Sequence, residues 1–248
     1  MTIAWSGIVL GLFVVMGFVN HTQNQTKCSG VFVDMDYSNG LFFIDETDVR
    51  NTINDLHGDL VGEVLKKIDI GNLEKELLNM NAVKNAEVFT DLNGKVFVEI
   101  IQRNPIARVF MADGKSGYID EVGKWMELSR KFTARVIVIN GNLPEGEKSM
   151  NAMDEKDSWN NLFVLTETIR NDEFLNAQFE QIYVNDNGDT VLIPRVGKHS
   201  ILLGKTDRLN KKFEKLKLFY NDGIAKVDWN KYKQIDLRYK DQIVCTKR

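Results

Sequence analysis

The feature that most constrains this chain is a run of seventeen residues without a charge, residues 3–19, which reads IAWSGIVLGLFVVMGFV. No charged side chain occurs before Lys27. A helix over residues 1–20 would be about 30 Å long, enough to cross the hydrocarbon core of a bilayer. The glycines of the run are common in membrane spans, and Trp5 suits the membrane interface. The sequence therefore predicts a transmembrane anchor and exit segment over residues 1–26.

A cleaved signal peptide is the competing interpretation of this run. It would show a basic start, a shorter apolar core and a small-x-small cleavage site. The run has no Lys or Arg before it, and residues 17–20 (GFVN) make a poor cleavage site. An uncleaved single-pass anchor is therefore favoured. The positive-inside rule has nothing to count before the span, and Lys27 argues weakly against placing the following residues outside the cytoplasm.

The next part of the chain, residues 27–103, combines strand and helix patterns. Asp45 is placed to cap a helix that carries Val49 and Ile53 on one face. Strands are predicted over residues 31–37, 86–90 and 95–101, with a second helix carrying Leu73, Leu77 and Met80 before the hairpin turn at 91–94. The predicted order is strand, helix, helix, strand, strand.

Residues 104–248 predict a mixed α/β domain with an antiparallel-rich sheet. Strands are expected over residues 106–111, 116–119, 134–140, 179–184, 190–194, 200–203 and 234–239. One helix begins at Ser158, and a second, capped by Thr206, turns Leu209, Phe213, Leu216 and Tyr220 inward and Lys211, Lys212, Lys215 and Lys217 outward. Residues 205–248 hold 13 Lys and Arg against 6 Asp and Glu, a net +7 that leaves −10 for the rest. This basic end fits a solvated face, an acidic partner or anionic lipid.

In residues 81–107, NAVKNAEVFTDLNGKVFVEIIQRNPIA, the individual residue types are informative as well as the hydrophobic pattern. This segment resembles the end of a POTRA domain of the FtsQ/DivIB family. Val83, Ala86 and Val88 match the V-x-x-A-x-V strand of that family. Val96, Val98, Glu99, Pro105 and Ala107 match the following strand, with residues 102–104 filling a gap before the proline. The resemblance implies a POTRA domain over residues 27–103.

The resemblance continues through the second domain. Residues 117–123 are similar to the family's hairpin after the proline, and residues 235–239 (IDLRY) are similar to the V-D-L-R-Y strand near the family's end. The resemblance implies a non-catalytic division protein of the inner (plasma) membrane. Its short N-terminus would be cytoplasmic, its bulk periplasmic, and it would gather at the division septum to help regulate septal cell-wall synthesis. Its partners would be the single-span proteins FtsB and FtsL.

The resemblance also implies how those partners bind. The last strand would leave an open edge to which a partner strand adds by backbone hydrogen bonds. The match places this edge at seven residues: Arg238, Tyr239, Lys240, Asp241, Gln242, Ile243 and Val244. Tyr239 is either an aromatic anchor for the partner or part of the core of its own domain.

Enzyme motifs and ligand sites are not predicted. No Ser-x-x-Lys occurs, the three histidines have no metal-site spacing, and the two cysteines make neither a disulfide framework nor a zinc site. His199 is expected to be a surface residue at a strand end. The sequence predicts no cofactor, no metal, no nucleic acid and no small-molecule substrate. Two alternatives stay open: a POTRA-bearing membrane adaptor for secretion or envelope assembly, and an anchored envelope hydrolase without a recognisable motif.

Overall fold

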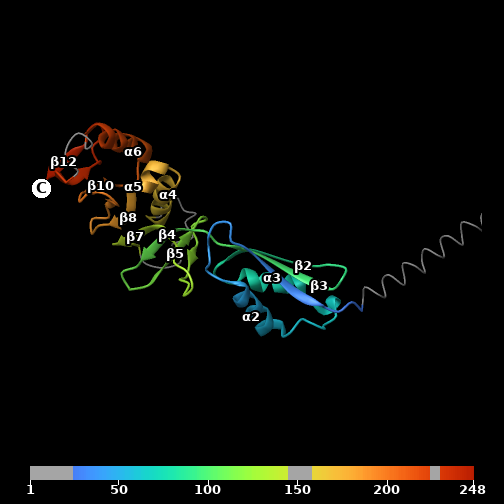
Figure 1. The fold of residues 1–248 in the computed structure, drawn as a ribbon. Coiled ribbons are helices and arrows are strands. Elements are labelled where there is room, and N and C mark those ends of the chain that lie inside the picture. The colour runs from blue at the N-terminus through green and yellow to red at the C-terminus, as the bar shows by residue number, and fades with distance from the viewer. Residues whose placement is uncertain (1–24, 145–157, 224–229) are drawn as a thin grey trace, which may run out of the picture. The chain divides into compact units, whose positions relative to one another are not determined.

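The computed structural model describes residues 25–144, 158–223 and 230–248. The chain divides into two compact units, shown in Figure 1. Unit 1 comprises Met1–Arg103 with Ser129–Phe132, and unit 2 comprises Asn104–Leu128 with Thr133–Arg248. The predicted anchor over residues 3–19 lies outside the described residues. Among those described, no helix is long and apolar enough to cross a membrane.

Unit 1 has the predicted order of strand, helix, helix, strand and strand. Its elements are β1 (Gly30–Asp36), α2 (Glu46–His57), a 3₁₀ turn η1 (Leu65–Lys67), α3 (Ile70–Leu78), β2 (Val83–Thr90) and β3 (Lys95–Gln102). The sheet order is β1-β3-β2, so the last strand lies in the middle. β1 runs parallel to β3 and β2 runs antiparallel to it.

The core of unit 1 lies between one face of this sheet and the two helices. Burial alternates along β3, which turns Val96, Val98 and Ile100 inward. They share a hydrophobic cluster with Ile53 of α2 and Leu77 of α3. Each such aliphatic side chain contributes about 1.5–3 kcal/mol on burial, so the alternating pattern fixes which face of β3 meets the helices.

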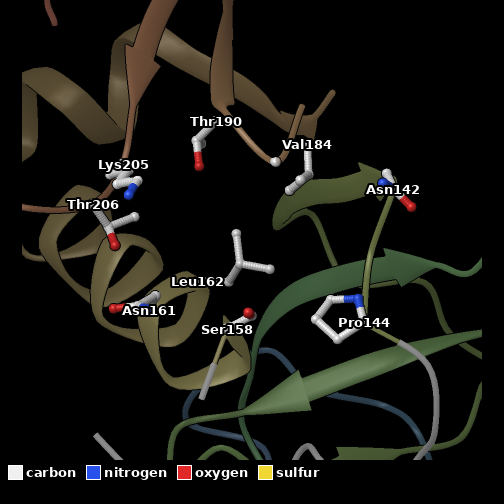
Figure 2. Close-up of a pocket in the computed structure, with 10 residues that line it drawn as sticks. Asn142, Pro144, Ser158, Asn161, Leu162, Val184, Thr190, Lys205 and Thr206 are labelled. Atoms are coloured by element: carbon white, nitrogen blue, oxygen red, sulfur yellow. The ribbon is translucent and has the colours of Figure 1, made fainter. Parts of the chain in front are cut away.

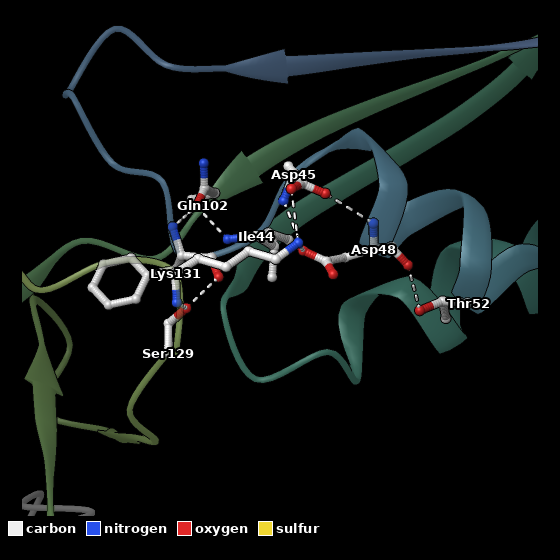
Figure 3. A network of polar contacts seen from close by, with 8 residues as sticks. Ile44, Asp45, Asp48, Thr52, Gln102, Ser129 and Lys131 are labelled. Carbon is white, nitrogen blue, oxygen red and sulfur yellow. Dashed lines mark hydrogen bonds and ion pairs between the residues drawn. The ribbon is translucent and has the colours of Figure 1, made fainter.

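Helix α2 begins at a reciprocal cap, as predicted for Asp45. The Asp48 amide donates to Asp45 Oδ1 (3.1 Å) and the Asp45 amide donates to Asp48 Oδ2 (2.9 Å). Lys131 then bridges the two carboxylates, with Nζ 2.7 Å from Asp45 and 2.6 Å from Asp48, as Figure 3 shows. These hydrogen bonds raise the pKa of Lys131 and lower the pKa of Asp45. Negative charge at a helix start is favourable, and Lys131 balances the pair of carboxylates.

The segment that leads into α2 is held by Gln102. The side chain of Gln102 is buried, and its Oε1 accepts the amides of Phe43 (2.9 Å) and Ile44 (3.3 Å) (Figure 3). Its Nε2 donates to the carbonyl of Leu41 (2.9 Å). Ser129 adds a hydrogen bond from its hydroxyl to the carbonyl of Phe43 (2.7 Å). A single amide therefore satisfies three backbone groups that would otherwise lack partners.

Unit 2 is built on a mixed sheet of nine strands among the described residues, in the order β12-β11-β10-β9-β8-β7-β4-β5-β6. The strands are β4 (Pro105–Phe110), β5 (Ser116–Asp120), β6 (Trp125–Met126), β7 (Ile137–Gly141), β8 (Phe179–Val184), β9 (Thr190–Pro194), β10 (Ser200–Gly204), β11 (Tyr232–Asp236) and β12 (Val244–Lys247). The helices are α4 (Ser158–Arg170), α5 (Glu173–Gln178), α6 (Leu209–Leu218) and the π-helical turn η3 (Phe219–Gly223). Five strand pairs are antiparallel and three are parallel.

One hydrophobic cluster joins this sheet to its helices. Trp159 of α4 and Phe213 of α6 are buried in it beside strand residues such as Ile139 and Ile182. The inward face predicted for the last helix is confirmed, because Leu209, Phe213, Leu216 and Tyr220 are all buried. The two cysteines are free: Cys28 is buried in unit 1 and Cys245 lies in β12.

Three local expectations in unit 2 are wrong. Thr206 does not cap α6; the capping position is Arg208, in a left-handed conformation (φ 49°) without a side-chain hydrogen bond.

Lys212 is not on the outer face of α6: it is only 3% exposed. Its Nζ donates to Leu203 O (3.1 Å), Lys205 O (2.6 Å) and Asp207 Oδ1 (2.8 Å). All three of its donors are satisfied, which allows the charge to be buried. His199 is also buried rather than exposed, because its Nε2 lies 2.7 Å from the hydroxyl of Tyr220.

Candidate partner-binding edge

Strand β11 ends earlier than predicted, at Asp236 instead of residue 239. The carboxylate of Asp236 accepts the backbone amide of Arg238 (3.0 Å), which turns the chain two residues after the strand. The last ladder contact is the amide of Leu237, which donates to Leu202 of β10 (2.9 Å). The sequence IDLRY is therefore a strand end followed by a side-chain-stabilised turn.

Arg238 closes this turn. Its guanidinium pairs with Asp236 (2.8 Å) and reaches Asp189, which precedes β9 (3.1 Å). Burial alone would raise the pKa of Asp236, but the hydrogen bonds from Arg238 outweigh it and hold that pKa below its usual value. The charges of Asp236 and Arg238 are thus paired within unit 2, which gives Arg238 a structural role.

The turn itself is fastened to helix α6 by Lys215. Its Nζ donates to the carbonyl of Tyr239 (2.5 Å) and to that of Gln242 (3.3 Å). Partial burial lowers the pKa of Lys215. The side chain of Tyr239 is left 46% exposed, so Tyr239 is not part of the core of its own domain. An ordered turn that presents an exposed aromatic ring is suited to contact with another chain.

Strand β12 forms one edge of the sheet. It pairs antiparallel with β11 over Tyr232–Lys247, Gln234–Thr246, Ile235–Cys245 and Asp236–Val244. Among the described residues no strand pairs with its other side. The amide of Arg248 donates inward to Lys231 (3.3 Å). Because the direction of backbone groups alternates along an antiparallel strand, Cys245 and Lys247 direct theirs away from β11.

The seven residues predicted as the edge strand divide between this turn and β12. Arg238–Ile243 connect β11 to β12, with Ile243 packed against the core, and Val244 is the first residue of the edge strand. Prediction from sequence missed Cys245, Thr246 and Lys247, which complete the strand, and Lys215, which holds the turn. The β-branched Val244 and Thr246 were the only local signal for a strand there.

Unit 2 also contains an open pocket of ≈ 370 Å³, shown in Figure 2. It lies beside the start of α4 and is lined by Asn142, Pro144, Ser158, Asn161, Leu162, Val184, Gly188, Thr190, Lys205 and Thr206. Lys205 is the one ionisable side chain among these described lining residues. In the described parts of the chain, no three His, Cys, Asp or Glu side chains are grouped to hold a metal ion.

Comparison with known families agrees with the two-unit architecture. A family model described as "FtsQ/DivIB, C-terminal related" matches residues 104–246, more than half of the chain. The chain belongs to the FtsQ/DivIB family. A second model, for a POTRA-like domain, matches residues 26–101, in unit 1. The FtsQ/DivIB match spans the whole of β11, the Arg238 turn and nearly all of β12. No curated protein matches the chain.

Proposed function

We propose that this chain is a non-catalytic component of the bacterial division machinery that binds a strand from an FtsB-like or FtsL-like partner along β12. The observation that carries the proposal is the edge of β12 that no described strand covers, inside the region that matches the FtsQ/DivIB family. The binding reaction is strand addition, in which the partner's backbone groups pair with those that β12 directs outward.

The size of this edge limits what backbone pairing can contribute. Cys245 and Lys247 present two N–H and two C=O groups. At about 0.5–1.5 kcal/mol for each hydrogen bond, four bonds contribute on the order of 2–6 kcal/mol. Binding energy of about 4 kcal/mol corresponds to millimolar affinity. Useful affinity therefore requires side-chain contacts as well, and the exposed ring of Tyr239 is the first candidate for them.

Two observations support the location proposed for this reaction: the apolar run supports a membrane anchor, and membership of the FtsQ/DivIB family supports the side of the membrane and the septum. Residues 3–19 would anchor the chain in the inner (plasma) membrane by a single span, with units 1 and 2 in the periplasm and the protein enriched at the division septum. By controlling when its partners assemble there, the chain would help regulate septal cell-wall synthesis. No cofactor, nucleic acid or small-molecule substrate enters this function.

The test is binding of the partners' periplasmic segments to residues 25–248, measured by calorimetry on three variants. Lys247→Pro removes an outward amide without removing a bond to β11, and we expect it to weaken binding at least tenfold. Lys247→Ala removes the same charge but keeps the amide, and should bind within twofold of the wild type. Tyr239→Ala should weaken binding by a further, separable amount.

Two results would contradict the proposal. Equal affinity for Lys247→Pro and Lys247→Ala, with circular dichroism unchanged, would exclude strand addition at this edge. No binding of either partner by the folded wild type, together with capture of transport components from envelope extracts, would favour a POTRA-bearing adaptor for secretion or envelope assembly. Release of muropeptides by the purified chain would favour a hydrolase.

A further inference from the structure

The first described residues of unit 1 are clamped between two other segments. The amide of Cys28 donates to Glu63 (2.7 Å), and the amide of Leu65 donates to Thr26 (2.9 Å). On the other side the amide of Ser29 donates to Gly94 (2.8 Å). We call this part of unit 1 the entry end; it consists of residues 26–29, 62–66 and 91–95. The point at which the chain arrives from residues 1–24 is thereby fixed to the turn between β2 and β3.

The turn between β2 and β3 is rigid and packs closely on the entering chain. Asp91 Oδ1 accepts the amides of Asn93 (2.9 Å) and Lys95 (2.8 Å), and these bonds hold the pKa of Asp91 low. At Gly94 (φ +87°) a Cβ would lie 2.3 Å from the carbonyl oxygen of Lys27, so only glycine fits. The tip of this ordered turn is Leu92, which is 85% exposed, more than any other large hydrophobic side chain that the structure describes.

The surroundings of Leu92 extend the apolar character of this end. A shallow groove of ≈ 620 Å³ lies beside it, in which Leu65 is the second apolar side chain; its other lining residues are polar or charged: Thr26, Lys66, Thr90, Asp91 and Asn93. On the outer face of the sheet, Phe32, Phe97 and Phe89 form a stacked row with centroids 5.5 and 5.3 Å apart. Lys95 lies between the tip and this row, with Nζ 5.2 Å from the centre of the Phe32 ring.

Basic side chains outnumber acidic ones only slightly at the entry end. The entry end contains three basic residues, Lys27, Lys66 and Lys95, and two acidic ones, Glu63 and Asp91. Each Lys near an anionic lipid surface is attracted to it, but a balance this small cannot hold a protein on a membrane alone. Exposed Leu92 and the aromatic row favour an occupant with an apolar layer, and the small excess of lysines is compatible with anionic groups on it. A phospholipid bilayer surface offers both.

We propose that the entry end of unit 1 rests on the lipid bilayer, with Leu92 inserted among the phospholipid headgroups. The inference rests on the anchor proposed above for residues 3–19. Six residues lie between Val19 and Thr26, and the seven Cα–Cα steps from one to the other span at most about 25 Å. Thr26 must then lie within that reach of the bilayer, and the turn that carries Leu92 is bonded to the chain just after it, through the Ser29 amide and the Gly94 carbonyl. Burial of the Leu92 side chain in the bilayer surface would remove exposed apolar surface from water. With this second contact, the POTRA-like unit would have a restricted orientation relative to the membrane, instead of rotating freely about the linker to its anchor.

The test places a nitroxide label either in the turn before β3 or near the far end of β3, in the full chain reconstituted in vesicles of phosphatidylethanolamine and phosphatidylglycerol. The variants are Leu92→Cys and, as the matched control, Ile101→Cys, both with Cys245→Ser; Cys28 is buried and does not react. Ile101 is 40% exposed and lies about 20 Å along β3 from Lys95. Collision rates are measured with oxygen, which concentrates in lipid, and with a water-soluble nickel chelate.

We expect the ratio of the oxygen collision rate to the nickel-chelate collision rate to be several-fold higher at position 92 than at position 101. Equal, water-like accessibility at both positions, in a chain that floats with the vesicles, would overturn the inference and leave the anchor intact. A label at 92 that is shielded from both reagents only when FtsB-like and FtsL-like segments are added would assign the entry end to a protein partner. A chain that does not float with the vesicles would overturn the anchor, and this inference with it.

Discussion

Replacement of Lys212 by methionine isolates the effect of one buried charge on unit 2. The Lys212 side chain is 4% exposed and its partner Asp207 is 52% exposed. Removal of one partner from a fully buried pair costs about 3–5 kcal/mol, because the other charge is stranded. Here Asp207 can be hydrated instead. The main loss is the hydrogen bond to the buried carbonyl of Leu203, which from a charged donor contributes about 1.5–3 kcal/mol.

We therefore expect Lys212→Met to lower the free energy of unfolding of unit 2 by about 2 kcal/mol. The assay is urea unfolding of residues 25–248 followed by tryptophan fluorescence, since every tryptophan in that range belongs to unit 2. Lys211→Met is the matched control: Lys211 is exposed on the same helix, and its change should stay within about 0.5 kcal/mol.

The same variant carries a second readout at Asp207. Hydrogen bonds from Lys212, and then from Arg208, lower the pKa of Asp207 from 3.8 to about 2. Because the folded-state pKa is below the unfolded one, Asp207 stabilises unit 2 above pH 3.8, and this contribution is lost as the pH falls toward 2. In Lys212→Met the pKa of Asp207 should rise part of the way to 3.8, as measured by NMR titration. An unchanged pKa, or unfolding energies equal to those of Lys211→Met, would refute this account of Lys212.

Two further predictions concern positions that the fold requires. Gln102→Leu leaves the amides of Phe43 and Ile44 without their acceptor, and we expect a loss of about 2–4 kcal/mol in unit 1, measured by hydrogen exchange of α2; exchange rates equal to the wild type would contradict it. Gly117→Ala should lower the midpoint of unfolding of unit 2, because a Cβ there would lie 2.2 Å from the indole of Trp125. Rescue by Trp125→Leu in the same assay would confirm the cause, whereas a Gly117→Ala midpoint equal to the wild type would exclude it.

Prediction from sequence was most accurate where structure depends on neighbouring residues. The cap at Asp45 needs only Asp48, three residues later. The alternation of apolar and polar residues that buries Val96 and Val98 lies within a single strand. These signals act within one element, so a pattern of residue types is sufficient to identify them.

Two of the errors came from side chains with partners distant in sequence. Polarity predicted an exposed His199, but Tyr220, 21 residues later, gives it a buried hydrogen bond. The strand predicted through residue 239 stops early because Arg238 turns back toward Asp236 and Asp189, the latter 49 residues away. The edge strand lies at β12, which shares only Val244 with residues 238–244, and partner binding at these residues stays a prediction.

The segment Ser129–Phe132 has a consequence for how unit 1 is completed. Lys131 and Ser129 come later in the chain than the first strands of unit 2, yet they bond to Asp45, Asp48 and Phe43. During N- to C-terminal synthesis, more than eighty further residues must therefore be made after the start of α2 before its last bonding partners are available. A fragment that ends at Arg103 would keep the sheet and both helices of unit 1 but would lack Lys131, which pairs with the carboxylates of Asp45 and Asp48. Experiments on such a fragment would therefore describe unit 1 without one of its own segments.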